Sequence, residues 1–203
     1  MAHYFIFGYG SLIYKDSRDK SGESGDSIPV KVNGIRRGWN IAISQARAVA
    51  LGATQETTAR CNGVIFSVAG SEIAKFDERE IKHGYNRIIL GRDTVARIDG
   101  KPIPDGEIFA YASAKAIHDV PRDIPLIQSY IDVTMTGCLL LGGEAFAREF
   151  VHTADGWNRA WENDRAFPRY PRPLKEVLFA ETIDRILAEE IPRFFSRRAE
   201  VTG

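Results

Sequence analysis

The spacing of apolar residues predicts strands in the first half of the chain and helices in the second. Residues 4–7 form a short apolar and aromatic run, which is typical of a buried strand. Further strand-like patterns occupy residues 30–44, 63–68, 85–90, 93–98 and 107–113. Residues 16–27 and 54–60 are polar, so we expect two surface loops there, and Asp99, Gly100 and Lys101 predict a hairpin turn.

Helical patterns begin with a short segment at residues 71–80, where Ile73 and Phe76 fall on one face. Longer helices are predicted over residues 126–141 and 144–152, separated by Gly142 and Gly143, and over 174–195 with an interruption at Pro192. Strands followed by helices indicate an α+β domain with a mixed sheet or a small barrel.

Composition narrows the class of protein. A chain of 203 residues suits one domain that can bury a sizeable core. Its 27 basic and 27 acidic residues balance, which gives no support for a nucleic-acid or membrane partner. Cys61 and Cys138 lie far apart and show no zinc-ligand spacing. With no signal peptide or membrane span in the pattern, we expect a cytoplasmic enzyme without metal or cofactor.

A glycine-rich loop follows the first predicted strand. Gly8, Tyr9, Gly10 and Ser11 form a turn whose backbone N–H groups lack bulky neighbours, so it can accept an anionic or amide group. Ile13 occupies the position where a dinucleotide fingerprint needs glycine, and the phosphate-loop ending is missing. On spacing alone, a plain structural turn stays equally open.

An acidic segment lies near the end of the short predicted helix. Asp77 and Glu80 are three positions apart and share a helix face, whereas Glu78 points elsewhere. A carboxyl group enclosed by apolar neighbours has a raised pKa and becomes a usable general base and acid near neutral pH. A solvated helix end is the alternative, and spacing does not select Glu80 over Glu78.

These two segments together resemble the γ-glutamyl cyclotransferase superfamily, which includes ChaC-like and AIG2-like members. The first signature is a strand followed by Y-G-S-N or Y-G-S-L, and residues 7–12 are FGYGSL. The second is an L-D-x-x-E-type segment followed by a tyrosine-bearing strand, which corresponds to FDERE at 76–80 and then Tyr85. Leu12 is the ChaC-like choice, and Phe76 replaces the usual leucine.

The resemblance implies a small mixed β-barrel with flanking helices over residues 1–150. Residues 151–203 would be a helical C-terminal extension packed on the same domain. It also implies that Glu80 is the catalytic general acid/base. The residues that it implies for substrate binding are Tyr9, Gly10, Ser11, Leu12, Tyr85 and Tyr111.

The implied reaction is the intramolecular cyclisation of a γ-glutamyl compound, glutathione or a γ-glutamyl amino acid, to 5-oxoproline. The nucleophile is the substrate's own α-amino group, so the enzyme needs no serine or cysteine nucleophile and no metal. Two alternatives stay open: a γ-glutamylamine as substrate, and a non-catalytic member of the fold that binds a small molecule.

The C-terminal extension mixes basic and aromatic residues. Arg159, Arg165, Arg169 and Arg172 alternate with Trp157, Trp161 and Tyr170, a pattern that can contact nucleic acid. Glu162 and Asp164 dilute the positive charge, so we favour a segment that packs its tryptophans on the domain or forms a homodimer contact.

Overall fold

A strongly bent, mostly antiparallel sheet forms the centre of the molecule. The computed structural model describes residues 3–81, 85–113 and 120–201. Within them the hydrogen-bonded strand order is β4-β6-β1-β3-β2-β5, and β8 pairs with β2. The pairs β1–β6 and β2–β8 are parallel. The strands are β1 (Tyr4–Gly8), β2 (Ser27–Ile43), β3 (Ala48–Val68), β4 (Asn86–Ile89), β5 (Val95–Arg97), β6 (Glu107–Ala112) and β8 (Ala154–Asp155).

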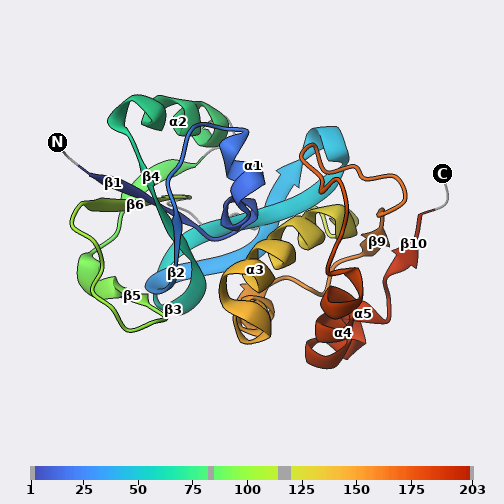
Figure 1. Ribbon diagram of the computed structural model, residues 1–203. Helices are drawn as coiled ribbons and strands as arrows, with labels where there is room; N and C mark the ends of the chain where they lie inside the picture. Colours follow the sequence, from blue (N-terminus) through green and yellow to red (C-terminus); the bar gives the residue numbers. More distant parts are fainter. Residues whose placement is uncertain (1–2, 82–84, 114–119, 202–203) are drawn as a thin grey trace.

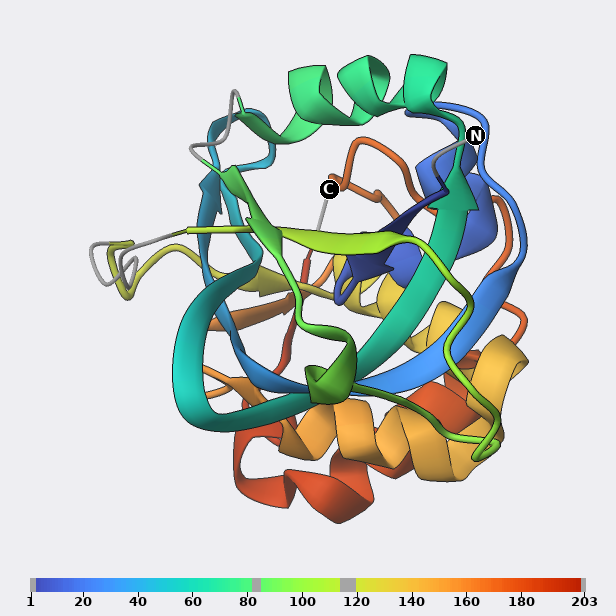
Figure 2. The ribbon, with the colours of Figure 1, turned by 90° about the vertical axis from the view of Figure 1, so that its left-hand side faces the viewer.

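Helices cover the sheet from opposite sides. Figure 2 shows α2 above the strands, with α3 and α4 below them. The α-helices are α1 (Lys15–Asp19), α2 (Ile73–Ile81), α3 (Gln128–His152), α4 (Ala180–Glu190) and α5 (Pro192–Phe195). Short 3-10 helices are η1 (Ser11–Ile13), η2 (Ser44–Ala46), η3 (Gly70–Glu72) and η4 (Arg92–Thr94). A second small sheet joins β7 (Leu126–Ile127), β9 (Trp161–Asn163) and β10 (Ala199–Glu200).

Strand β1 separates two hydrophobic clusters because successive side chains of a strand point to opposite faces. Ile6 belongs to the larger cluster, which includes the inner face of α3. Phe5 and Phe7 belong to the smaller cluster on the other face. Burial on both faces explains why the run at residues 4–7 is continuously apolar.

Helix α3 is the central helix, and its early part is buried almost all round. The predicted break between two helices lies where expected, since Gly143 has a φ of 66° inside an otherwise helical run. Glycine adopts this left-handed conformation without a steric cost. The expected interruption at Pro192 is also confirmed, because α4 ends at Glu190 and α5 begins at Pro192.

Two predicted loops are wrong. Residues 54–60 belong to β3, which continues along β2 as a long antiparallel ribbon despite its polar sequence. Residues 16–27 include α1 and the start of β2, and Arg18 within them is fully buried. Its guanidinium lies over the Phe66 ring at 4.8 Å, so a charged side chain that suggested a surface loop is part of the core.

The predicted barrel is not confirmed. The strand order is an open path, and an isolated bridge pairs Thr54 of β3 with Ser113, the residue after β6. The turn at Asp99 and Gly100 also forms no hairpin, since β5 pairs with β2 whereas β6 pairs with β1 and β4. What the structure does have is a mixed α+β fold with flanking helices.

The C-terminal residues, which follow α3 at positions 153–201, lie against α3 and the end of the β2–β3 ribbon where η2 joins the two strands (Figure 1). Trp157 packs edge-on against Trp39 with a centroid distance of 5.1 Å, and both rings are buried. The division of the chain at residue 150 stays a prediction, and α3 itself crosses that position. Over the described residues, no helix is both long and apolar enough to cross a membrane.

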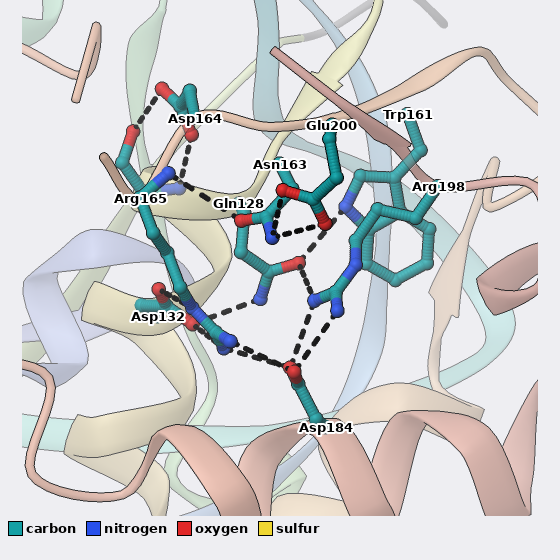
Figure 3. Close-up of polar contacts among 10 residues, drawn as sticks. Gln128, Asp132, Trp161, Asn163, Asp164, Arg165, Asp184, Arg198 and Glu200 are labelled. Atoms are coloured by element: carbon teal, nitrogen blue, oxygen red, sulfur yellow. Dashed lines mark hydrogen bonds and ion pairs between the residues drawn. The ribbon is translucent and has the colours of Figure 1, made fainter. Parts of the chain in front are cut away.

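An ion-pair network fastens the C-terminal residues to α3 (Figure 3). Arg165 donates to Asp132 of α3 and to Asp184 of α4, each at 2.8 Å. Arg198 donates to Asp184 at 2.9 Å and to Gln128 of α3 at 3.1 Å. Two guanidinium groups and two carboxylates therefore neutralise one another where three segments meet.

We predict that Asp184→Asn destabilises the protein in a pH-dependent way. Burial raises the pKa of Asp184, but hydrogen bonds from Arg198 and Arg165 outweigh burial and hold that pKa below its usual value of 3.8. The stabilisation is therefore present above the unfolded pKa and is lost as the pH falls through the folded pKa. Urea unfolding near neutral pH should show a loss of about 2 kcal/mol, and this difference should shrink in acid.

The exposed Glu181 of the same helix offers a matched control. Glu181→Gln should change the free energy of unfolding by less than about 0.5 kcal/mol. A deficit of Asp184→Asn that is equally large at neutral and acid pH would contradict the role of its ionised carboxylate.

Candidate active site

A cavity of about 510 Å³ opens beside the end of β1. Its walls come from the loop after β1, from η2 and the adjoining ribbon, from α2, from α3 and from the C-terminal residues. This volume is in the range of small-molecule sites. All seven residues that the sequence singled out line this one cavity: Glu80, Tyr9, Gly10, Ser11, Leu12, Tyr85 and Tyr111.

The loop after β1 needs glycine at its centre. Gly10 lies there, directly before η1. A Cβ atom at this position would lie 3.0 Å from the Tyr130 hydroxyl and 3.4 Å from the Leu51 Cβ atom. The backbone therefore borders the cavity directly, as the sequence pattern predicts.

Buried arginines hold the carbonyl groups on both sides of this loop. Arg37, fully buried on β2, donates to the Tyr9 carbonyl at 3.1 Å and the Asn62 carbonyl at 2.7 Å. Arg18 donates to the Leu12 and Ile13 carbonyls at 3.3 and 3.2 Å. The loop is thus held from behind by charge-assisted hydrogen bonds, which are stronger than neutral ones.

Three acidic side chains on α2 have different surroundings. Asp77 accepts hydrogen bonds from Arg87 and, at 2.8 Å, from the Tyr111 hydroxyl, and the Arg87 guanidinium lowers its pKa. Glu78 is exposed. Glu80 is 8% exposed and lines the cavity. The geometry thus separates Glu80 from Glu78, which spacing alone does not.

Glu80 forms an ion pair with Arg79 in the cavity wall. Its Oε1 atom lies 3.0 Å from the Arg79 Nε atom. Arg79 also donates to the hydroxyl groups of Ser11 at 3.0 Å and Ser21 at 2.8 Å. One arginine therefore connects the acid on α2 to the loop after β1.

The three predicted tyrosines surround the acid. Their hydroxyl groups donate to protein acceptors: Tyr9 to the Tyr111 carbonyl at 2.7 Å, Tyr85 to the Leu51 carbonyl at 3.2 Å, and Tyr111 to Asp77. Burial raises the pKa of each of the three, and the Glu80 charge raises it further. These hydroxyl groups stay protonated, and their oxygen lone pairs are the part that can accept a hydrogen bond from a ligand.

No protein-family model matches the chain, and no curated protein matches it in sequence. Solved structures do match. A γ-glutamyl cyclotransferase structure has 15% identity and a TM-score of 0.62, covering 90% of this chain and 99% of its own. An uncharacterized human protein has 16% identity and a TM-score of 0.61, covering 75% of this chain and 89% of its own.

The chain has the γ-glutamyl cyclotransferase fold. YkqA from Bacillus subtilis matches it too, with 14% identity and a TM-score of 0.51, covering 74% of this chain and 53% of YkqA. Identities this low establish the arrangement of elements and nothing about the substrate.

Several residues of the cavity escaped the sequence analysis. In this γ-glutamyl cyclotransferase fold, α3 contributes Tyr130 and the C-terminal residues contribute Tyr170 and Arg172, while Arg79 comes from the acidic segment itself. The mixture of arginine and aromatic residues in the extension was the available signal. It did not indicate a place beside the loop after β1, because more than 150 residues separate Ser11 from Arg172.

Side chains of the types that bind metal ions do not cluster in the described part of the chain. Among residues 3–81, 85–113 and 120–201, no group of three or more His, Cys, Asp or Glu side chains has an arrangement that could hold a metal ion. His83 and His118, which show no ligand spacing in the sequence, and Gly84 beside Tyr85 lie outside the described residues.

We predict that at least four of the seven tyrosines resist ionisation in the folded protein. Burial raises the pKa of Tyr9, Tyr85, Tyr111 and Tyr130 above the usual 10.0. The neutral phenols contribute stability that is complete below the unfolded pKa and is lost as the pH rises through the folded pKa. An ultraviolet titration should therefore show fewer tyrosinates near pH 10.5 (about half a unit above the ordinary pKa) than it shows in denaturant. Coincident titration curves with and without denaturant would disprove this.

Proposed function

We propose that the protein is a γ-glutamyl cyclotransferase, which converts a γ-glutamyl compound to 5-oxoproline and releases the amine. The observation that carries the proposal is that Glu80 and the loop at residues 9–12, which lie about 70 residues apart in the chain, line the same cavity. The γ-glutamyl cyclotransferase fold supports it. Glutathione and γ-glutamyl amino acids are the proposed substrates.

The reaction begins with a proton transfer. The α-amino group of the substrate becomes nucleophilic after it gives its proton to the Glu80 carboxylate, which acts as general base. The nitrogen lone pair then attacks the γ-carbonyl carbon, and a C–N bond closes the five-membered ring. Folding the substrate into this shape within an enclosed cavity removes much of the entropic barrier.

The second half of the reaction returns the proton. As the bond between the γ-carbon and the leaving nitrogen breaks, protonated Glu80 donates its proton to that nitrogen. The ring nitrogen still carries one proton more than the lactam, and this proton passes through the Glu80 carboxylate to the departing amine, which leaves as an ammonium ion, so that no water is consumed. In this proposal the backbone N–H groups of Gly10, Ser11 and Leu12 bind the glutamyl head. Preorganised donors of this kind stabilise charge without reorganising during the reaction.

The tyrosines complete the enclosure of the glutamyl head. Because the hydroxyl protons of Tyr9, Tyr85 and Tyr111 are directed at protein acceptors, the oxygen atoms of these hydroxyls are left to accept from the substrate ammonium group. Their rings form the walls that exclude water.

Other expectations from the sequence stay predictions. They include the cytoplasmic location, a homodimer, the absence of nucleic-acid and membrane partners, and the division into residues 1–150 and 151–203. A γ-glutamylamine substrate and a purely binding role are the alternative outcomes of the experiment below.

We predict that Glu80→Gln greatly slows 5-oxoproline release. Purified protein should release 5-oxoproline from glutathione, γ-glutamyl-alanine or a γ-glutamylamine, and the preferred compound identifies the leaving group. Removing the general acid/base should lower kcat by about 10² to 10⁴-fold. Glutamine keeps the shape of the side chain, so the melting temperature should change little.

Glu78→Gln is the matched control, since Glu78 lies on the same helix and is exposed. It should retain the wild-type rate. If Glu80→Gln is as active as the wild-type protein, the carboxylate has another role. If the folded wild-type protein is inactive on all three compounds, a binding function is favoured instead.

A further inference from the structure

Two arginines meet at one end of the candidate active site. Arg79 of α2 and Arg172 of the C-terminal residues both line the cavity. Both donate to the same acceptor, the Ser21 hydroxyl oxygen, at 2.8 and 2.7 Å. Arg172 also donates to the Ser17 carbonyl at 3.1 Å. The shared acceptor keeps the two guanidinium groups close together.

The charge of the cavity is unbalanced. Among its lining residues, two arginines face one carboxylate, Glu80. Burial lowers the pKa of Arg172, and the neighbouring Arg79 charge lowers it further, whereas Glu80 acts in the opposite direction. An additional anion placed between the two guanidinium groups would relieve this repulsion. It would also accept hydrogen bonds from those guanidinium N–H groups that do not donate to Ser21 or Ser17.

The position of Arg172 is set by buried contacts in the preceding residues. Asp164 accepts hydrogen bonds from the Ser129 backbone N–H at 2.7 Å and from the Arg169 backbone N–H at 2.9 Å. Ser129 in turn accepts from the Tyr170 backbone N–H at 3.2 Å. Tyr170 packs edge-on against Tyr130 with a centroid distance of 4.7 Å.

These contacts continue the network that fastens the C-terminal residues to α3. Asp164 and Arg165 are adjacent in Figure 3, and Arg165 reaches Asp132 and Asp184. Asp164 and Arg165 are therefore fixed on α3, and Arg172 reaches the cavity only a few residues later in the chain. A rigidly held arginine binds a carboxylate at a lower entropic cost than a mobile one.

We propose that Arg79 and Arg172 form a subsite for a carboxylate on the leaving amine of the substrate. The inference rests on the proposed function and specifies the substrate class: γ-glutamyl amino acids or peptides rather than neutral γ-glutamylamines. Glu80 gives its proton to the leaving nitrogen, so that nitrogen lies next to Glu80. Because Arg79 Nε lies 3.0 Å from Glu80 Oε1, a carboxylate carried close to that nitrogen lies within reach of the arginine pair.

The test compares two compounds that differ only in this charge, γ-glutamyl-alanine and γ-glutamyl-alaninamide. The wild-type protein should favour the acid in kcat/KM by about 10- to 100-fold, the range expected for a hydrogen-bonded charge pair. Arg172→Gln should reduce the ratio to less than about 3, and the change should appear mainly in KM. Arg172→Lys should keep part of the preference, because lysine retains the charge without the planar fork.

Arg193→Gln is the matched control, because Arg193 is exposed on α5 and does not line the cavity. It removes the same charge and should leave the ratio as in the wild-type protein. Melting temperatures of all variants show whether each one is folded. Equal use of acid and amide by the wild-type protein, or a ratio that Arg172→Gln does not change, would overturn the subsite while leaving the cyclotransferase activity intact.

Failure of the proposed function has a different signature. In that case neither compound yields 5-oxoproline, and calorimetry measures the affinity of the same proteins for both compounds. If the wild-type protein binds the acid more tightly than the amide, and Arg172→Gln removes this difference, the carboxylate subsite is still supported. Equal affinities, or no binding of either compound, would overturn it.

Discussion

The buried guanidinium of Arg37 is the interaction on which the rest of the site depends. It leaves β2 and donates to the Tyr9 carbonyl at the end of β1, to Asn62 on β3, and to the Phe150 carbonyl on α3. Burial of an unpaired charge is costly, and here carbonyl oxygens and the Phe150 ring, 4.2 Å away, offset that cost. One side chain thereby holds two strands and a helix against the loop that lines the cavity.

The candidate active site is completed by residues from the far end of the chain. The loop after β1 and the acid of α2 form one side, while Tyr170 and Arg172 close the other. The ion pairs between α3, α4 and the C-terminal residues hold this closing wall in place. The residues that follow α3 are therefore part of the cavity wall.

Local sequence was most informative where burial and backbone geometry act together. The apolar run at residues 4–7, the break at Gly143 and the stop before Pro192 all follow from short-range rules, and the structure agrees with them. The polar residues 54–60 and the charged residues 16–27 were misassigned. There, pairing with β2 and the burial of Arg18 outweigh local polarity, and neither partner can be inferred from the segment itself.

The sequence by itself determined the α+β class, the glycine-rich loop after the first strand and the acidic segment, because each depends on residues close together in the chain. The family resemblance implied Glu80, but only the tertiary structure placed its carboxylate at the cavity. Only the tertiary structure decided that Asp77 accepts hydrogen bonds from Arg87 and Tyr111. The tertiary structure also places Arg79 and Arg172 so that both donate to the Ser21 hydroxyl oxygen. Contacts between residues so far apart in the chain depend on the packing of distant elements and on the burial of charge. A local sequence pattern contains no information about either.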